Sequence, residues 1–241
     1  TYFARHRRAF GSRLVDLPLM QRQLLKMLVP TEQARSIMFQ TAAALERADR
    51  GDEAARALVR ILTPLIKFRA CRDARKVTGD AMEVRGGCGY IEEWAEARLL
   101  RDAHLGSIWE GTSNIVALDV LRAIERNRCL PALREHVERL LAEGRACPPD
   151  LAPLQDEALD KAFLLAEHAA HGKRPELARQ AASALYNMLT LAALRWEAAH
   201  EGLSTRGAIA DLVLRHRLAP RDPCAQDGAA PELDALEALV F

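Results

Sequence analysis

Helical spacing of apolar residues is the feature that most constrains the fold of this chain. Apolar side chains recur three and four positions apart through most of the sequence, and the alternation typical of strands is nearly absent. Asp52 is a residue type that caps helix N-termini, and the clearest apolar stripe follows it: Leu58, Ile61, Leu62, Leu65 and Ile66. Because such stripes become buried when helices pack together, the pattern predicts an all-α fold.

The chain is predicted to form two helical units. Residues 1–126 are expected to fold as an antiparallel bundle, with helices at 1–8, 18–29, 31–50, from 52 to the glycines near 86, and from 112 onward. Pro30 separates the second helix from the third in this scheme, and a loop is expected from the glycines to about Ser107. Residues 127–241 are expected to form a helical extension, with helices at 131–143, 154–170, 175–200, 204–218 and 231–241.

The composition is that of a globular protein without a membrane span. Hydrophobic residues make up 49% of the chain and charged residues 28%, and no apolar run approaches the roughly 20 residues that cross a bilayer. The five cysteines lack metal-ligand spacing, which favours free thiols and a cytoplasmic location. Because the sequence opens at Thr1, inside a predicted helix, we expect a piece of a longer protein.

Charge is distributed unevenly between the two units. Residues 1–126 hold 21 Lys and Arg against 16 Asp and Glu, whereas residues 127–241 hold 13 against 17. The first unit is therefore the better place for phosphate groups.

A glycine cluster, Gly86-Gly87-Cys88-Gly89, is the strongest break in the first unit. Glycines let the backbone approach a ligand closely and expose its N–H groups. A dinucleotide-binding loop requires a preceding strand, and here a helix precedes the cluster. A helix C-cap followed by a tight turn is the simpler interpretation, and the ligand-binding interpretation stays open beside it.

Two charged positions are candidates for chemistry. Glu110 stands between Trp109 and Gly111, before a helix start, and a carboxylate beside an aromatic wall in a site closed to water is suited to act as a general base. The alternative is a surface carboxylate that supports the helix N-terminus. Arg7 precedes Phe10, and arginine is the preferred residue for bidentate phosphate contacts, although taken alone the segment favours a solvated basic helix end.

Taken together, in this order and spacing, these segments resemble the C-terminal domain of the acyl-CoA dehydrogenases. The resemblance covers about residues 1–126. It is closest to the branch of the bacterial adaptive-response alkylation-protection flavoproteins, whose relatives also carry a helical segment after the bundle. The matching segments are Arg7-x-x-Phe10-Gly11, Gly86-Gly87-x-Gly89-Tyr90, Arg101-Asp102-Ala103, Trp109-Glu110-Gly111-Thr112-Ser113 and, for the branch, 64–68, 81–84, 107–111 and 118–122.

The resemblance implies an FAD-dependent dehydrogenation of an acyl-CoA thioester. Glu110 would be the catalytic base that takes the α-proton, and Gly111 would face the substrate. At the helix N-terminus, the flavin phosphates would contact Thr112, Ser113 and Asn114. The FAD of a neighbouring subunit would be reached by Arg7, Phe10, Glu83, Gly86 and Gly87. That sharing implies a homodimer or homotetramer, and electron-transfer flavoprotein would be the acceptor.

The sequence departs from the family pattern in three places. Glu83 stands where glutamine is usual, and a carboxylate there repels pyrophosphate. Trp109 replaces the usual tyrosine and narrows the pocket, and Pro18 stands where many members have a polar flavin contact. The family places an N-terminal helical domain and a middle β-domain before this point, so the isolated chain is expected to have little activity.

Two other functions compete with the dehydrogenase. The first is an alkylation-response flavoprotein that binds duplex DNA and retains vestigial dehydrogenase activity, and the second is a purely structural bundle. Duplex binding needs clustered cations, which the acidic balance of residues 127–241 disfavours. The local basic cluster in that unit is also consistent with a solvated helix end, and it consists of Arg215, His216, Arg217 and Arg221.

Overall fold

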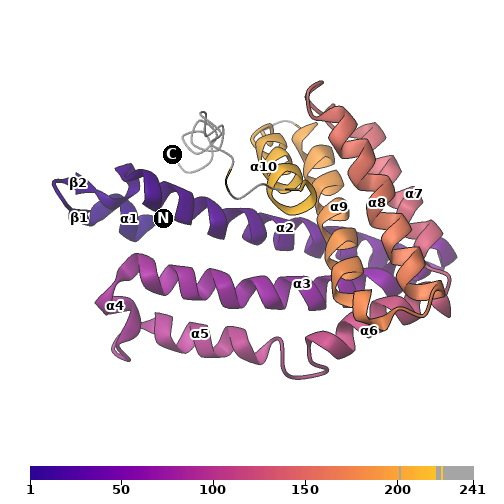
Figure 1. Cartoon of the computed structure of the whole chain (residues 1–241), viewed down its shortest axis with the longest axis horizontal. Helices are drawn as coiled ribbons and strands as arrows, with labels where there is room; N and C mark the ends of the chain where they lie inside the picture. The colour runs from indigo at the N-terminus through magenta and orange to yellow at the C-terminus, as the bar shows by residue number, and fades with distance from the viewer. Residues whose placement is uncertain (201, 221–223, 225–241) are drawn as a thin grey trace.

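Two long helices run the length of the molecule and organise the rest of it (Figure 1). The computed structural model describes residues 1–200, 202–220 and 224, and these confirm the all-α prediction. Helix α2 (Pro18–Asp49) and helix α3 (Glu53–Arg85) lie side by side and are joined by a turn in which Gly51 has φ +96°. Asp52 caps α3, as predicted, because its carboxylate accepts a 3.0 Å hydrogen bond from the backbone N–H of Ala55.

The second half of the bundle continues along α3. After the short helix α4 (Gly87–Tyr90), helix α5 (Ala95–Leu105) packs back along α3, and α6 (Ser113–Glu125) follows it. An ion pair of 2.6 Å between Arg85 and Glu96 joins the end of α3 to the start of α5.

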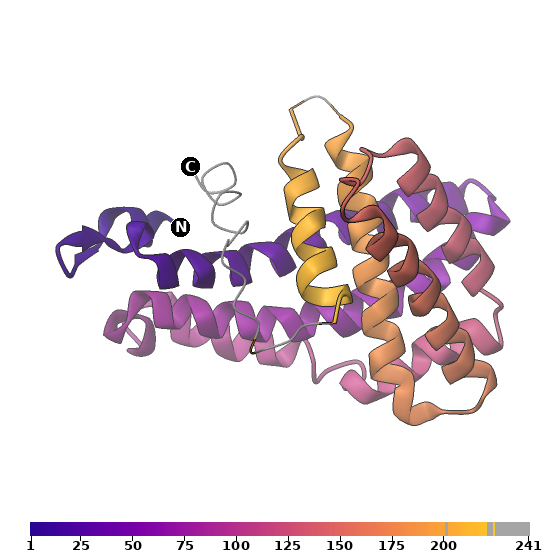
Figure 2. The same ribbon diagram turned by 45° about the horizontal axis from the view of Figure 1, so that its top comes forward.

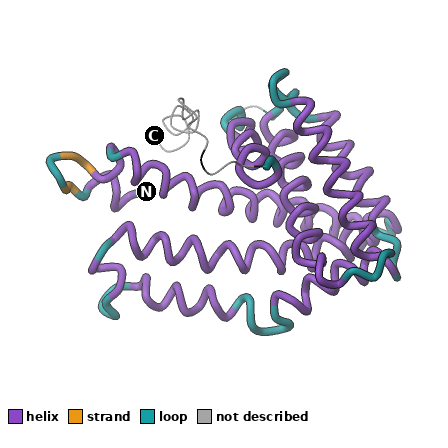
Figure 3. Tube along the Cα trace, viewed as in Figure 1, coloured by secondary structure: helices purple, strands orange, loops and turns teal. Residues whose placement is uncertain are grey.

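The N-terminal segment forms a small cap at one end of the bundle. It consists of α1 (Tyr2–His6), a two-stranded antiparallel hairpin of β1 (Arg8–Ala9) and β2 (Ser12–Arg13), and a 3-10 turn, η1 (Leu14–Asp16). Figure 3 shows this hairpin projecting from the end of α2. Ala4 and Val15 fix the cap by packing with Leu24 of α2 and Val84 of α3 in a separate small core.

The extension packs across the far end of the two long helices. Its elements are α7 (Leu130–Glu143), α8 (Ala152–His171), η2 (Pro175–Leu177), α9 (Ala178–Ala198), α10 (Arg206–Val213) and the π-helical turn η3 (Leu214–Leu218). Helix α9 is central: every residue from Leu185 to Arg195 is buried, and α9 contacts α2, α3, α6, α7, α8 and α10 (Figure 2). A helix buried on all sides belongs to the interior of a protein. The main core therefore runs through both predicted units.

Three predicted boundaries are wrong. The helices expected at 18–29 and 31–50 are one continuous helix, because Pro30 removes a single backbone donor while the apolar faces on both sides of it stay packed against α3. The hydroxyl of Thr31 adds a 2.8 Å hydrogen bond to the Met27 carbonyl in the same turn. The loop expected up to Ser107 contains α5, whose stretch of Ala, Glu, Leu and Arg favours a helix that packs on α3. The first helix ends at His6, and the hairpin begins at Arg8.

The last predicted helix, at 231–241, lies outside the described residues. No helix within the described part of the chain is long and apolar enough to span a bilayer.

Arg206, at the start of α10, links the extension to the bundle through buried ion pairs. Its side chain is 6% exposed and contacts the carboxylates of Glu32 on α2 and Glu197 on α9, which are 13% and 14% exposed. It also donates a 2.8 Å hydrogen bond to the hydroxyl of Ser36. The Arg206 guanidinium thus pairs with two carboxylates that have little access to water, and the more exposed Arg35 also pairs with Glu32 at 2.8 Å.

Replacing Arg206 with methionine should lower the free energy of unfolding by about 3–5 kcal/mol, because both carboxylates lose their buried cation. Urea unfolding followed by circular dichroism measures the change. Arg56→Met is the matched control, since the Arg56–Glu53 pair is 57% and 78% exposed and should contribute less than about 1 kcal/mol. A loss for Arg206→Met no larger than that of the control would contradict the structural role of these pairs.

His136 on α7 is a buried histidine that is held neutral. It is 7% exposed, and the guanidinium of Arg139 lies 3.4 Å from its Nδ1. Burial, reinforced by the positive charge of Arg139, lowers the pKa of His136 to about 4.

Stability should therefore fall with acid more steeply than it would without this histidine. An unfolded histidine titrates near pH 6.5, so between about pH 6.5 and about pH 4 the unfolded chain takes up a proton that the folded chain does not. The stability lost across this window amounts to about 3 kcal/mol at most. In urea unfolding at about pH 7 and about pH 4.5, His136→Gln should lose less stability than the parent, and His104→Gln, an exposed control, should behave as the parent. Equal losses for His136→Gln and the parent would refute the assignment.

Candidate active site

The connection between α5 and α6 carries Glu110 and is anchored by a lysine of α3. The ammonium of Lys67 donates hydrogen bonds to the carbonyls of Gly106, at 2.9 Å, and Trp109, at 3.0 Å. It also lies 5.9 Å from the centre of the Trp109 ring, within the range of a cation–π contact. These contacts fix the turn immediately before Glu110.

Glu110 adopts a strained backbone conformation at the mouth of a surface hollow. Its φ is +51°, a left-handed value that is uncommon for residues other than glycine, and Gly111 follows with φ +105°. The hollow has a volume of about 730 Å³ and is also lined by Lys67, Ile115 and Asp119. The two successive left-handed residues turn the chain sharply into α6 and place the Glu110 carboxylate at the surface.

Glu110 is open to water within the described structure. Its side chain is exposed, and the neighbouring Trp109 is 56% exposed. Apolar side chains surround it at the surface, since Leu105, Ile108 and Ile115 are each half exposed or more. The aromatic neighbour expected from the sequence is present, but nothing in the described part of the chain closes the site.

The N-terminus of α6 has the features of an anion site. Thr112 is the N-cap residue, as predicted, but its hydroxyl makes no capping hydrogen bond, and the first turn of α6 contains no acidic residue. The N–H groups of a first helical turn have no partner within the helix, and the helix dipole favours negative charge there. Thr112, Ser113 and Asn114 therefore present donors next to Glu110 in a suitable place for phosphate oxygens.

The remaining candidates lie around the β1–β2 hairpin and α4, at the tip of the bundle, and α5 separates them from the α5–α6 connection (Figure 1). Phe10 stands at the turn of the β1–β2 hairpin with φ +55° and is 94% exposed, and Arg7 directly precedes the first strand. Glu83 lies in the last turn of α3 and accepts a 3.1 Å hydrogen bond from the Gln23 side chain, which orients its carboxylate. Gly86 and Gly87 follow at the tip.

The glycine cluster forms a helix C-cap and a tight turn, as its simpler interpretation predicts. Gly86 caps α3 with φ +61°. At Gly89 a side chain is excluded, because a Cβ atom there would lie 2.3 Å from the Met82 carbonyl oxygen. Gly86 and Gly87 have open space around them, so their backbone is accessible from outside.

The candidates thus form two separate groups in one chain. Glu110 to Asn114 lie at the α5–α6 connection, and Arg7, Phe10, Glu83 and the glycines lie around the hairpin and α4, with the length of α5 between them (Figure 1). A ligand that touches both groups of one chain at once would have to span that length.

The basic cluster of the extension points partly inward. Arg217 is 23% exposed and lines a cavity with His216, while Arg215 is 3.3 Å from Asp150 at the surface. The interpretation as a fully solvated helix end is therefore wrong for Arg217. Arg221 lies outside the described residues.

Lys67 was not identified from the sequence as a site residue. It falls within segment 64–68, which contributes to the family resemblance, but its role depends on carbonyls 39 and 42 positions away. Only the packing of α5 against α3 brings them together.

Comparison with known proteins places the first half of the chain in one family. Residues 1–125 match the family described as acyl-CoA dehydrogenase, C-terminal domain. The chain is 39% identical to the Escherichia coli protein AidB over 125 residues, which cover 52% of this chain and 23% of that protein. It is 32% identical over 162 residues to acyl-CoA dehydrogenase family member 11 of Caenorhabditis elegans, covering 66% and 25% of the two chains. The chain therefore spans about a quarter of the length of these relatives.

Solved structures extend the likeness into the second half. Caenorhabditis elegans ACDH-11 in complex with C11-CoA superimposes with a TM-score of 0.80 at 26% identity, over 91% of this chain and 40% of that one. An acyl-CoA dehydrogenase from Bacillus anthracis complexed with FAD has the same fold, with a TM-score of 0.69 at 19% identity, over 98% and 44%.

Replacing Lys67 with methionine should loosen the turn that carries Glu110. The amides of Ser107, Ile108 and Trp109 hydrogen-bond within this turn, and their exchange with deuterium should accelerate about tenfold or more, because two carbonyls lose a charged donor. Hydrogen-exchange mass spectrometry measures this. Lys173→Met, at an exposed lysine, is the matched control. Unchanged exchange in Lys67→Met would show that the lysine does not hold the turn.

Proposed function

The chain belongs to the acyl-CoA dehydrogenase family, and we propose that it is the C-terminal part of an FAD-dependent enzyme that removes hydrogen from the α and β carbons of an acyl-CoA thioester. The family is one of oxidoreductases. Because the chain spans about a quarter of its relatives, the activity is that of a longer protein, and the chain alone is expected to be nearly inactive.

One observation carries the proposal: Glu110 is held at the surface by a defined backbone geometry, directly before a helix end suited to phosphates. A surface carboxylate that only supports a helix end does not need a left-handed conformation, which costs about 1–3 kcal/mol. Strain of this kind concentrates at active sites. Glu110 is therefore proposed as the base that takes the α-proton on a carboxylate oxygen, with Gly111 leaving room for the thioester.

The residues at the start of α6 fit FAD. The hydroxyl of Thr112 is not used for capping, and with Ser113 and Asn114 it would hold flavin phosphates at the positive end of the helix dipole. When bound, FAD supplies the acceptor for the hydride that leaves the β carbon. Electron-transfer flavoprotein is the proposed acceptor of the electrons from the reduced enzyme.

The second group of candidates is proposed to serve the flavin of a neighbouring subunit. Arg7, Phe10 and the Gly86–Gly87 backbone are accessible around the hairpin and α4, separated from Glu110 by the length of α5. A 94% exposed Phe10 in a left-handed turn is suited to a contact outside its own chain. This division favours a homodimer or homotetramer. Glu83 is the least suitable of these residues for contacting the flavin, because its carboxylate repels phosphate unless a cation lies between them.

The apolar surface around Glu110 is proposed to be covered by the acyl chain and by the domains that precede this one in its relatives. Covering it would exclude water from the carboxylate and so provide the closed site that a base of this kind needs.

Duplex DNA binding is the weaker alternative, since Arg215 pairs with Asp150 and Arg217 lies largely inside the fold.

Anaerobic reduction of the flavin tests the proposal. The complete flavoprotein that contains this chain should lose its oxidised-flavin absorbance when mixed with acyl-CoAs of graded chain length. Glu110→Gln should slow this reduction by about 10²–10⁴-fold, because an amide cannot take the proton. Glu135→Gln, an exposed glutamate of α7, is the matched control and should react as the parent.

Two results would contradict the proposal in different ways. Absence of bleaching with every acyl-CoA tested would remove the dehydrogenase function. Unimpaired bleaching in Glu110→Gln would keep the function but place the base elsewhere.

A further inference from the structure

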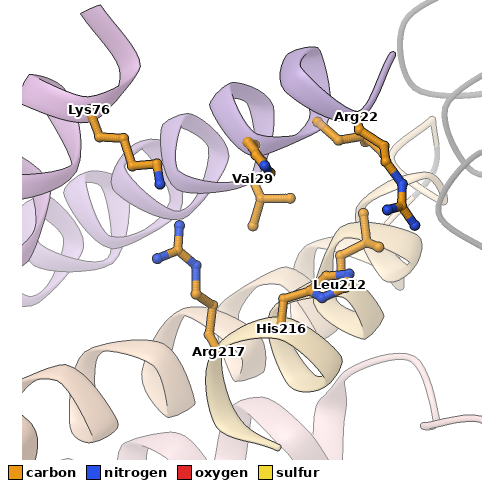
Figure 4. Close-up of a pocket in the computed structure, with 8 residues that line it drawn as sticks. Arg22, Val29, Lys76, Leu212, His216 and Arg217 are labelled. Carbon is orange, nitrogen blue, oxygen red and sulfur yellow. The ribbon is translucent and has the colours of Figure 1, made fainter. Parts of the chain in front are cut away.

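A cavity of about 330 Å³ lies where the extension meets the bundle, between α2, α3, α10 and η3 (Figure 4). It is distinct from the hollow at Glu110, and no residue lines both. The lining is strongly basic and, among the described residues, contains no Asp or Glu. It consists of Arg22, Leu25, Lys26, Val29, Lys76, Leu212, His216 and Arg217.

The face of α2 that borders the cavity combines apolar and cationic residues. Leu25 and Val29 are buried there, and Arg22 and Lys26 stand one helical turn apart on the same face. Like charges at this spacing destabilise a helix slightly, and a face that packs against another helix is normally apolar. Arg22 and Lys26 are both exposed, so they add positive charge at the solvent-facing side of the cavity.

Arg217 brings a further cation into the interior from η3. Its side chain is 23% exposed, and the carboxylate of Asp73 is 3.9 Å away. Asp73 already accepts hydrogen bonds of 2.8 Å and 3.0 Å from Arg69, so its charge is shared between two guanidinium groups. Burial lowers the pKa of Arg217, and the positive charge of Arg69 adds to this effect while Asp73 opposes it.

Lys76 faces Arg217 from the other wall. Figure 4 shows the lysine ammonium and the guanidinium pointing toward one another across the cavity. The surroundings are also cationic, since Arg69, Arg75 and Arg179 are close enough to Arg72, one turn before Lys76, to lower its pKa in addition to the effect of burial. Like charges with apolar walls around them concentrate a positive potential in the space between them.

We propose that this cavity binds a small molecule that carries a phosphate or pyrophosphate group, held between Lys76 and Arg217. Arginine provides a planar pair of donors for phosphate oxygens, and lysine acts as a compact charge. Leu25, Val29 and Leu212 offer an apolar surface for the rest of the ligand. The volume is at the lower end of the range of ligand pockets, roughly 300–1,000 Å³, so it suits a small ligand rather than a polymer.

The chain contains one competing source of negative charge. Residues 221–241 hold five Asp and Glu against one Arg. Carboxylates of this segment could satisfy the same cations, so the experiment includes a chain that ends at Pro220.

Isothermal titration of the 241-residue chain with inorganic pyrophosphate at low ionic strength tests the proposal. We expect saturable binding with one site per chain, weaker binding of inorganic phosphate, and loss of affinity with added salt. Lys76→Gln should weaken pyrophosphate binding about tenfold or more. Because the Lys76 side chain is exposed, this variant should keep the parent's circular dichroism and thermal midpoint. Lys173→Gln removes the same charge from a surface turn and should bind as the parent.

Four results would overturn the proposal. The first two are absence of pyrophosphate binding in both chain lengths and an equal loss of affinity in Lys76→Gln and Lys173→Gln. Binding that appears only after removal of residues 221–241 would make that segment the occupant. Binding of duplex DNA that depends on Lys76 and is not displaced by pyrophosphate would replace the small ligand with nucleic acid. The proposal does not rest on the dehydrogenase function, since neither Glu110 nor flavin takes part in the test.

Discussion

Burial of α9 on all sides is the constraint on which the rest of the structure depends. The eleven residues from Leu185 to Arg195 have no face left for water, so α2, α3 and α6 must supply one wall and α7, α8 and α10 the other. Two of its polar residues are matched inside, because the Gln33 amide of α2 donates to Asn187 at 3.1 Å and Thr190 at 2.7 Å. Loss of α9 would expose the apolar faces of both layers at once, so the bundle and the extension stabilise each other.

This arrangement leaves the free ends of the bundle available for function. The far ends of α2 and α3 are locked under α9, whereas the hairpin, α4 and the α5–α6 connection project beyond it (Figure 1). A rigid pair of long helices can hold a strained turn such as Glu110-Gly111 because the cost is borne by packing elsewhere. Lys67 connects the two regions, since it sits on a packed helix and binds the carbonyls of the turn.

The sequence predicts a helix correctly where its start and its buried face depend on residues close together in the chain. The stripe from Leu58 to Ile66 and the cap at Asp52 both predict α3 correctly, because spacing and capping depend on neighbours within four residues. Pro30 led to the wrong prediction of two separate helices. The helix is continuous there, because the residues on both sides of the proline pack against α3. The role of Lys67 and the inward turn of Arg217 depend on contacts between distant helices, which periodicity cannot encode. The candidate residues were identified through family motifs, which already divide them between two flavin sites. The structure adds that the length of α5 separates the two groups within one chain.

The position of the basic cavity follows from the same packing. Helix α9 contacts α2, α3, α10 and η3, and residues of these four elements line the cavity (Figure 4). An apolar lining there would simply extend the main core, and Leu25, Val29 and Leu212 begin to do so. Lys76 and Arg217 interrupt that apolar lining with two facing charges, of which Lys76 is exposed and Arg217 is 23% exposed. The proposed phosphate ligand would contact the bundle through Lys76 and the extension through Arg217, so its binding would stabilise the contact between the two layers.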